Sequence, residues 1–193
     1  VNSIYQLPLV FKNQILDEII LSHFNLICKF SDLKTWEKNV VERALSPKYK
    51  VTIAFVGKYI TLQDAYKSIH EALVHAGIEN DACVDIKRVD SEDIEKGDPK
   101  KVLEGVNGVL VPGGFGYRGI EGKIKSIKFA RENKIPFLGL CLGMQCAVIE
   151  FSRHICGMKE ANSTEFKPNT KYPVISLLAE QRKIKDLGGT MRL

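Results

Sequence analysis

The chain has 193 residues, of which 45% are hydrophobic and 26% are charged, and its formal net charge is +5. This length allows a substantial buried core, and the composition is typical of a globular protein. No apolar run approaches the ~20 residues of a membrane helix, and the basic residues are dispersed rather than gathered in a patch. We therefore expect neither a membrane partner nor a nucleic-acid partner.

The first 47 residues carry helical patterns and no strand pattern. Apolar residues recur at helical spacing from Phe11 to Phe24, which predicts one helix there. A second helix, capped by Ser31 or Asp32, is predicted through Trp36 and should stop before Pro47. We interpret residues 1–47 as a helical extension rather than a domain with its own core.

From residue 48 onward, short apolar runs alternate with helical patterns. The predicted strands are 51–57, 83–89, 108–111 and 135–140. The predicted helices are 65–76, 123–133 and 142–152. Gly77 is predicted to stop the first of these helices, and Ser91 is predicted to cap a further short helix. This alternation predicts an α/β fold of three layers with a largely parallel, flavodoxin-like sheet, preceded by the helical N-terminal extension. Functional residues are expected after the strands, at 112–122 and 139–145.

One motif carries a specific chemical prediction. Residues 139–143 read Gly-Leu-Cys-Leu-Gly between a buried strand and a helix, which is the pattern of a nucleophile elbow with Cys141 in the nucleophile's place. The helix N-terminus favours a thiolate, and the N–H of Leu142 is expected to face a developing oxyanion. The alternative is a structural cysteine in a turn. We favour catalysis because two glycines at the elbow spacing coincide with a helix start.

The other cysteines and the histidines show no ligand pattern. The count of five cysteines is odd and no secretory signal precedes them, which indicates reduced thiols in the cytoplasm. Cys146 lies about 140° around the helix from Cys141 and has no comparable context. Because the four histidines do not join the cysteines at zinc spacing, we expect no metal site.

A glycine-rich loop follows the predicted strand 108–111. Gly114, Gly116 and Gly119 match a dinucleotide-binding fingerprint, but the loop follows the third strand and the next strand leads to Cys141, so we reject that interpretation. The N–H of Gly114 could instead pair with that of Leu142 to form an oxyanion hole. A plain glycine turn fits the loop equally well.

The segments 112–116 and 139–145 together resemble class I (triad-type) glutamine amidotransferases. Longer strings resemble the CTP synthase family, namely 56–59, 64–68, 115–119, 129–133, 162–166 and 186–193. Residues 3–8 and 33–36 resemble the end of that family's synthetase domain and its interdomain linker. The resemblance implies that residues 1–47 are this end and linker, and that residues 48–193 are the amidotransferase domain without its C-terminal part.

The resemblance also implies an activity. Such enzymes hydrolyse L-glutamine through a thioester, here on Cys141, and pass ammonia to the synthetase domain, where ATP and Mg serve the amination of UTP to CTP. The family is cytoplasmic and tetrameric, needs no cofactor in this part, and is activated allosterically by GTP. The implied site residues are Gly114 and Leu142 for the oxyanion, Gly114, Phe115, Gln145 and Glu165 for glutamine, and Arg118, Gly119 and Glu121 for a regulatory lid.

The family's triad also needs a His-x-Glu pair, which none of the four histidines provides. We expect this pair after Leu193, and we expect the chain by itself to be inactive. Two alternatives stay open. One is a cysteine hydrolase or chaperone with an elbow cysteine on a similar sheet, which the glycine-loop and 162–166 strings disfavour. The other is a regulatory remnant without activity, which the presence of Cys141, Gln145 and Glu165 disfavours.

Overall fold

The computed structural model describes residues 1–28, 32–58, 66–114 and 116–178. The chain divides into two compact units. We call Val1–Thr52 with Leu62–Ile86 the helical unit, and Ile53–Thr61 with Lys87–Leu193 the site unit. The domain boundary at residue 47 stays a prediction.

The helical unit begins with short helices. They are η1 (Ile4–Gln6), α1 (Leu7–Asn13), α2 (Leu16–His23), α3 (Lys34–Trp36), the π-helical turn η2 (Glu37–Val41) and α4 (Glu42–Leu45). The prediction of one helix from Phe11 to Phe24 is wrong, because Ile15 adopts a left-handed conformation with φ +52° and separates α1 from α2. The second predicted helix is confirmed as α3, η2 and α4 in succession. Of its two predicted caps, Asp32 accepts a hydrogen bond from the Lys34 N–H at 2.9 Å, but the N-cap position itself is Leu33, and Ser31 lies outside the described residues.

Helix α5 (Lys67–Glu79) corrects a second expectation. Gly77 was predicted to stop this helix, but it lies inside α5 and is buried. A Cβ at Gly77 would come within 2.5 Å of the carbonyl oxygen of Ala82. The glycine is therefore explained by close packing against the following strand and not by helix termination.

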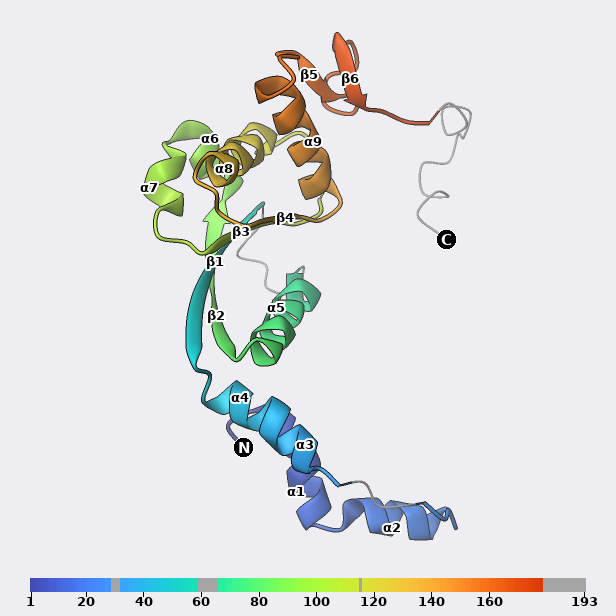
Figure 1. The fold of residues 1–193 in the computed structure, drawn as a ribbon. Coiled ribbons are helices and arrows are strands. Elements are labelled where there is room, and N and C mark those ends of the chain that lie inside the picture. Colours follow the sequence, from blue (N-terminus) through green and yellow to red (C-terminus); the bar gives the residue numbers. More distant parts are fainter. Residues whose placement is uncertain (29–31, 59–65, 115, 179–193) are drawn as a thin grey trace. The chain divides into compact units, whose positions relative to one another are not determined.

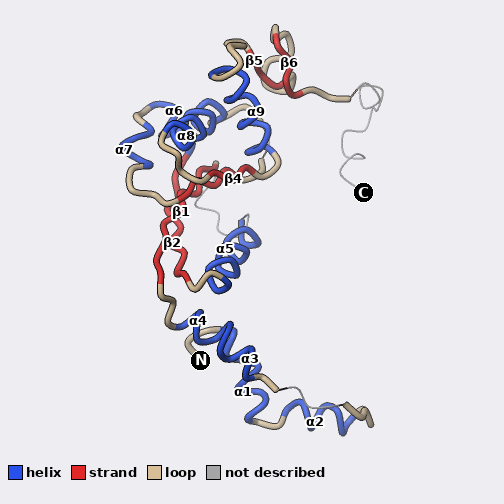
Figure 2. The backbone as a smooth tube through the Cα atoms, in the orientation of Figure 1, coloured by secondary structure: helices blue, strands red, loops and turns tan. Residues whose placement is uncertain are grey.

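The main sheet has four strands, β1 (Tyr49–Gly57), β2 (Ala82–Asp90), β3 (Gly108–Val111) and β4 (Phe137–Gly139), in the order β2-β1-β3-β4. Figure 2 shows these strands in red. Strand β3 pairs in parallel with β1, with Ala54 opposite Val109, and with β4, with Leu110 opposite Leu138. All four predicted strands are confirmed, although β4 is shorter than predicted.

In the site unit, α6 (Ser91–Lys96), α7 (Pro99–Leu103), α8 (Ile120–Glu132) and α9 (Leu142–His154) follow the strands. Helix α8 packs against α6, α7 and α9, and both α8 and α9 contact β3 and β4 (Figure 1). The cap of α6 is Asp90 and not Ser91, because the Asp90 side chain accepts the Glu92 N–H. Helix α7 and the parallel strand pair β5 (Ala161–Ser163) and β6 (Tyr172–Ile175) carry no signal that we recognised.

The core of the site unit lies between these strands and helices. Strand β3 is buried along its whole length, which explains its continuous apolar sequence. The helices contribute Ile120, Ile124 and Ile127 from α8 and Leu142, Cys146 and Ile149 from α9. Because α9 packs into this core from its first residue, the turn between β4 and α9 is fixed at both ends.

Candidate active site

The site unit brings two loops together at the ends of adjacent strands. Val111, the last residue of β3, is opposite Gly139, the last residue of β4, and the Leu140 N–H donates to the Val111 carbonyl at 2.9 Å. The loops that follow the two strands therefore start side by side. This is the arrangement predicted for the carboxyl ends of parallel strands.

Cys141 occupies a strained turn between β4 and α9. Its φ is +50° and its ψ is −106°, a backbone conformation that side-chain-bearing residues rarely adopt, and it is the N-cap residue of α9. The residue is exposed. Strain at an exposed cysteine on the N-terminus of a packed helix is the geometry of a nucleophile elbow.

The two glycines around Cys141 are required by contact. A Cβ at Gly139 would lie 2.6 Å from the backbone of Gly143 and of Met144. A Cβ at Gly143 would overlap the carbonyl group of Val111. The turn closes only because neither residue has a side chain, which gives the G-x-C-x-G spacing its physical basis.

The glycine loop after β3 lies against the elbow. A Cβ at Gly113 would stand 3.4 Å from Cβ and 3.9 Å from Sγ of Cys141. A Cβ at Gly114 would stand 3.6 Å from the Leu142 side chain. The structure thus brings together the two residues predicted to form the oxyanion hole. The predicted substrate residue Phe115 lies outside the described residues.

The two other predicted glutamine-binding residues both follow these loops in the sequence, one on α9 and one after β5. Gln145 is half-buried one turn along α9, and its N–H donates to the Cys141 carbonyl at 3.1 Å. Glu165 follows β5, and its Oε1 accepts a hydrogen bond from the Gly116 N–H at 3.4 Å. A residue 49 positions away is therefore brought to the glycine loop.

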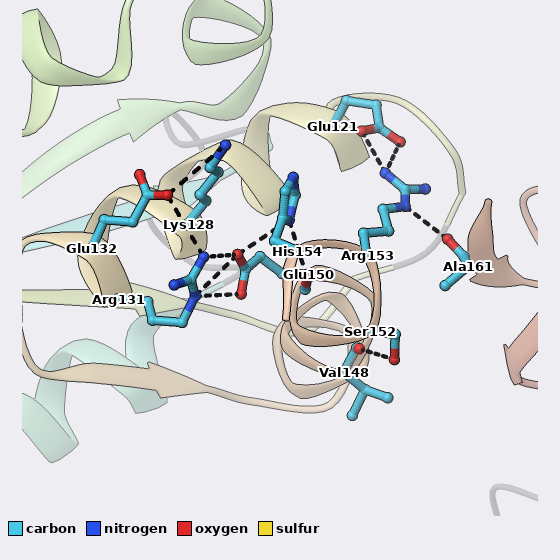
Figure 3. Close-up of polar contacts among 10 residues, drawn as sticks. All are labelled: Glu121, Lys128, Arg131, Glu132, Val148, Glu150, Ser152, Arg153, His154 and Ala161. Atoms are coloured by element: carbon cyan, nitrogen blue, oxygen red, sulfur yellow. Dashed lines mark hydrogen bonds and ion pairs between the residues drawn. The ribbon is translucent and has the colours of Figure 1, made fainter. Parts of the chain in front are cut away.

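The predicted lid residues hold the end of the glycine loop to different helices. Nε and Nη2 of Arg118 donate to Oε1 of Glu92 on α6, at 3.0 and 2.7 Å, and the guanidinium lowers the pKa of that carboxyl. Gly119 has φ +70° and caps α8. Glu121 accepts from Nη1 of Arg153 on α9 at 2.8 and 3.0 Å (Figure 3). Sequence reasoning missed Glu92 and Arg153, because pairs 26 and 32 residues apart leave no periodic signal.

A second polar cluster joins α8 to α9 away from the elbow (Figure 3). The buried carboxylate of Glu150 accepts from Nη2 of Arg131 at 2.8 Å and lies 3.2 Å from Nδ1 of His154. Since α9 rises about 1.5 Å per residue, His154 is about 20 Å along the helix from Cys141. This histidine cannot serve Cys141 as a base.

The neighbouring thiol has a different environment. Cys146 is fully buried, and burial raises the pKa of its thiol to about 11. A buried neutral thiol is a poor nucleophile. Cys141 is therefore the better placed of the two cysteines on this helix.

Among the described residues, no group of three or more His, Cys, Asp or Glu side chains is arranged to hold a metal ion. None of the helices in the described ranges has the length and apolar character needed to cross a membrane.

Comparison with known proteins decides the family. Residues 61–193 match the family model of glutamine amidotransferase class-I. The chain belongs to the class-I glutamine amidotransferases. It is also 55% identical over 192 residues to the CTP synthase of Carboxydothermus hydrogenoformans and 54% identical over 193 residues to that of Syntrophus aciditrophicus. These alignments cover 100% of this chain and 36% of each relative, so the chain spans about a third of their length.

A solved structure agrees with the fold. The glutaminase domain of Trypanosoma brucei CTPS with bound acivicin is 43% identical and superposes with a TM-score of 0.63, over 67% of this chain and 50% of that one. The predicted three-layer α/β fold class is confirmed, as is the resemblance on which the site residues were chosen. The individual roles of those residues stay predictions.

Proposed function

We propose that this chain is the glutaminase part of a CTP synthase, which hydrolyses glutamine at Cys141 and supplies ammonia for the ATP-dependent amination of UTP to CTP. The observation that carries the proposal is the exposed, strained Cys141 at the start of α9, closed in by Gly139 and Gly143. The identity of 54 to 55% to two CTP synthases supports the choice among amidotransferases.

The first half of the reaction forms a thioester. Sγ of Cys141 attacks the side-chain carbonyl carbon of glutamine, and the carbonyl oxygen becomes an oxyanion that the N–H groups of Gly114 and Leu142 stabilise. The carbon–nitrogen bond then breaks, and the amide nitrogen leaves as ammonia after it receives a proton. A Cβ at Gly114 would stand 3.6 Å from the Leu142 side chain, and this proximity of the two residues supports the assignment.

The second half releases glutamate. Water attacks the thioester carbonyl, the same two N–H groups hold the second oxyanion, and the Cys141 thiol is restored. Both halves need a base that takes a proton from the nucleophile and returns it to the leaving group. The family's His-x-Glu pair is predicted for this role, since His154 lies at the opposite end of α9.

Glutamine is oriented by its charged end. Glu165 is proposed to bind the substrate's α-ammonium through charge-assisted hydrogen bonds, while Gln145 and Phe115 flank the side chain. The hydrogen bond from Gly116 to Glu165 supports this placement, because it holds the carboxylate beside the glycine loop.

The remaining parts of the reaction belong to the proposed whole enzyme. ATP, Mg and UTP would bind the synthetase domain, and the glutaminase chemistry itself requires no cofactor. GTP would activate through the loop that carries Arg118, Gly119 and Glu121. We further propose a cytoplasmic homo-oligomer, a tetramer as in the family.

The test uses the full-length protein and its Cys141→Ala variant. We expect the variant to lose CTP synthesis from glutamine and to keep synthesis from free ammonia, because only glutamine hydrolysis uses the thiol. Acivicin, bound to the Trypanosoma brucei glutaminase domain, should block the glutamine-dependent reaction of the parent and leave the ammonia-dependent one intact. Loss of both activities in a folded Cys141→Ala variant would refute the assignment.

A further inference from the structure

The site unit buries one lysine that takes no part in the reaction proposed above. Lys123, in the first turns of α8, is 3% exposed. Among the described residues its ammonium forms no ion pair. An unpaired buried charge is costly, and lysines are almost never fully buried unless paired. Because burying this charge costs folding free energy, we looked for a function that the lysine could serve.

The Lys123 ammonium lies close to the glycine loop. Its Nζ is 4.0 Å from the point where a Cβ on Gly114 would stand, and the Leu142 side chain is 3.6 Å from the same point. Gly114 and Leu142 are the two residues whose N–H groups are proposed to hold the oxyanion. The ammonium therefore lies beside Gly114, one of the two residues of the proposed oxyanion hole, and the side chain of the other, Leu142, borders the same space.

The surroundings of Lys123 lower the pKa of its side chain. Burial lowers the pKa of Lys123, and the positive charge of Lys58 lowers it further. Cys146 on α9 and Asp90 at the end of β2 act in the opposite direction and raise it. The charge can thus be removed by titration at a pH below the 10.5 of an ordinary lysine.

We infer that Lys123 is a positioning residue for glutamine hydrolysis, whose ammonium stabilises the oxyanion of the transition state through the backbone of the Gly114 loop and the start of α9. The inference rests on the proposed function. A fixed positive charge in a poorly solvated place favours the developing negative charge without reorganisation. Because the substrate amide is neutral before attack, the positive charge stabilises the transition state and does not strengthen substrate binding.

The test compares Lys123→Met with Lys125→Met in the full-length protein. Lys125 is an exposed lysine two positions along the same helix, which makes its variant a control for loss of one positive charge. Methionine is close to lysine in length and removes an unpaired buried charge, so Lys123→Met should fold with an unchanged or higher Tm. Its kcat for glutamine should fall about tenfold or more, with KM within about twofold, and its ammonia-dependent activity should match the parent.

The pH profile separates this role from packing. The parent's kcat for glutamine should decline on the alkaline side as Lys123 loses its proton, and this decline should be absent from Lys123→Met and present in Lys125→Met. Unchanged glutamine kcat in Lys123→Met, or a loss that parallels a lower Tm, would overturn the inference. A parent enzyme that cannot use glutamine at all would overturn the proposed function and this inference with it, whereas an active parent with an unaffected variant overturns the role of Lys123 alone.

Discussion

Gly143 lies directly against the carbonyl group of Val111, with no room for a Cβ between them. This contact joins the first turn of α9 to the end of β3, one strand away from the strand that leads into the elbow. The position of Cys141 therefore depends on an approach of two backbone segments that only glycine allows.

Gly143→Ala should disrupt this approach. The added methyl group must displace α9 or β3, which we expect to lower the free energy of unfolding by about 3 kcal/mol. A shift of about 1 Å at the nucleophile should lower glutamine kcat by about 100-fold. Urea unfolding and steady-state kinetics measure both effects.

The control for that variant is Gly105→Ala. Gly105 has φ +79° and open space around its Cβ position, so alanine there introduces backbone strain of about 1 kcal/mol without a clash. Its glutamine kinetics should match the parent. Equal effects of the two substitutions on activity would show that the close contact with Val111 does not position Cys141.

Thiol modification should distinguish the two cysteines of α9. Iodoacetamide at pH 8 should alkylate the exposed Cys141 and spare Cys146, because Cys146 is fully buried and its thiol pKa is raised to about 11. Peptide mass spectrometry reads the two sites separately. In denaturant both should react alike, which provides the control. Faster labelling of Cys146 in the folded protein would contradict the elbow geometry.

Arg131→Met should destabilise the packing of α8 on α9. The side chain of Glu150 is 2% exposed and that of Arg131 is 32% exposed, so removing the arginine leaves a buried carboxylate without its main partner. Such a loss costs about 3 kcal/mol in the free energy of unfolding, measured in urea. Lys128→Met is the control, since its 3.9 Å pair with Glu132 is exposed and should contribute less than about 1 kcal/mol. Similar values for both variants would show that Glu150 is well solvated.

The elbow was predictable because close backbone contacts require glycine at two fixed positions of its pattern. Gly139 and Gly143 are required by backbone neighbours within a few residues or on the adjacent strand, and β3 is apolar throughout because it is buried throughout. Glycine spacing and a continuous apolar run are both visible in the amino-acid sequence. The resemblance then supplied Glu165, which spacing alone would never have singled out.

The wrong predictions from sequence share a physical cause, which is that tertiary contacts decide between alternatives that the local sequence allows equally. Gly77 can end a helix or admit a close strand, and the sequence does not say which. The left-handed Ile15 interrupts an apolar pattern that is otherwise continuous. Asp90 and Ser91 are both good caps one position apart, and tertiary packing makes the choice. Pairs such as Arg118 with Glu92 depend on how α6 meets α8, which no local pattern encodes.

Glu165→Gln tests the proposed site for the substrate's ammonium. The side-chain amide oxygen of the substituted residue can still accept a hydrogen bond from the Gly116 N–H. The contact with the glycine loop is therefore retained while the negative charge is lost. A charge-assisted hydrogen bond contributes about 2 kcal/mol, so kcat/KM for glutamine should fall roughly 30-fold. The loss should appear mainly as a raised KM if the contact is equal in the ground and transition states.

The matched control for Glu165→Gln is Glu160→Gln. Glu160 precedes β5, and within the described part of the chain its carboxylate has only an exposed 3.8 Å ion pair with Lys167, so its neutralisation should leave both activities unchanged. Ammonia-dependent CTP synthesis should be normal in both variants, because ammonia bypasses the glutamine site. A Glu165→Gln enzyme whose kcat/KM for glutamine equals that of Glu160→Gln would mean that Glu165 is a solvated loop carboxylate, and that another group binds the ammonium.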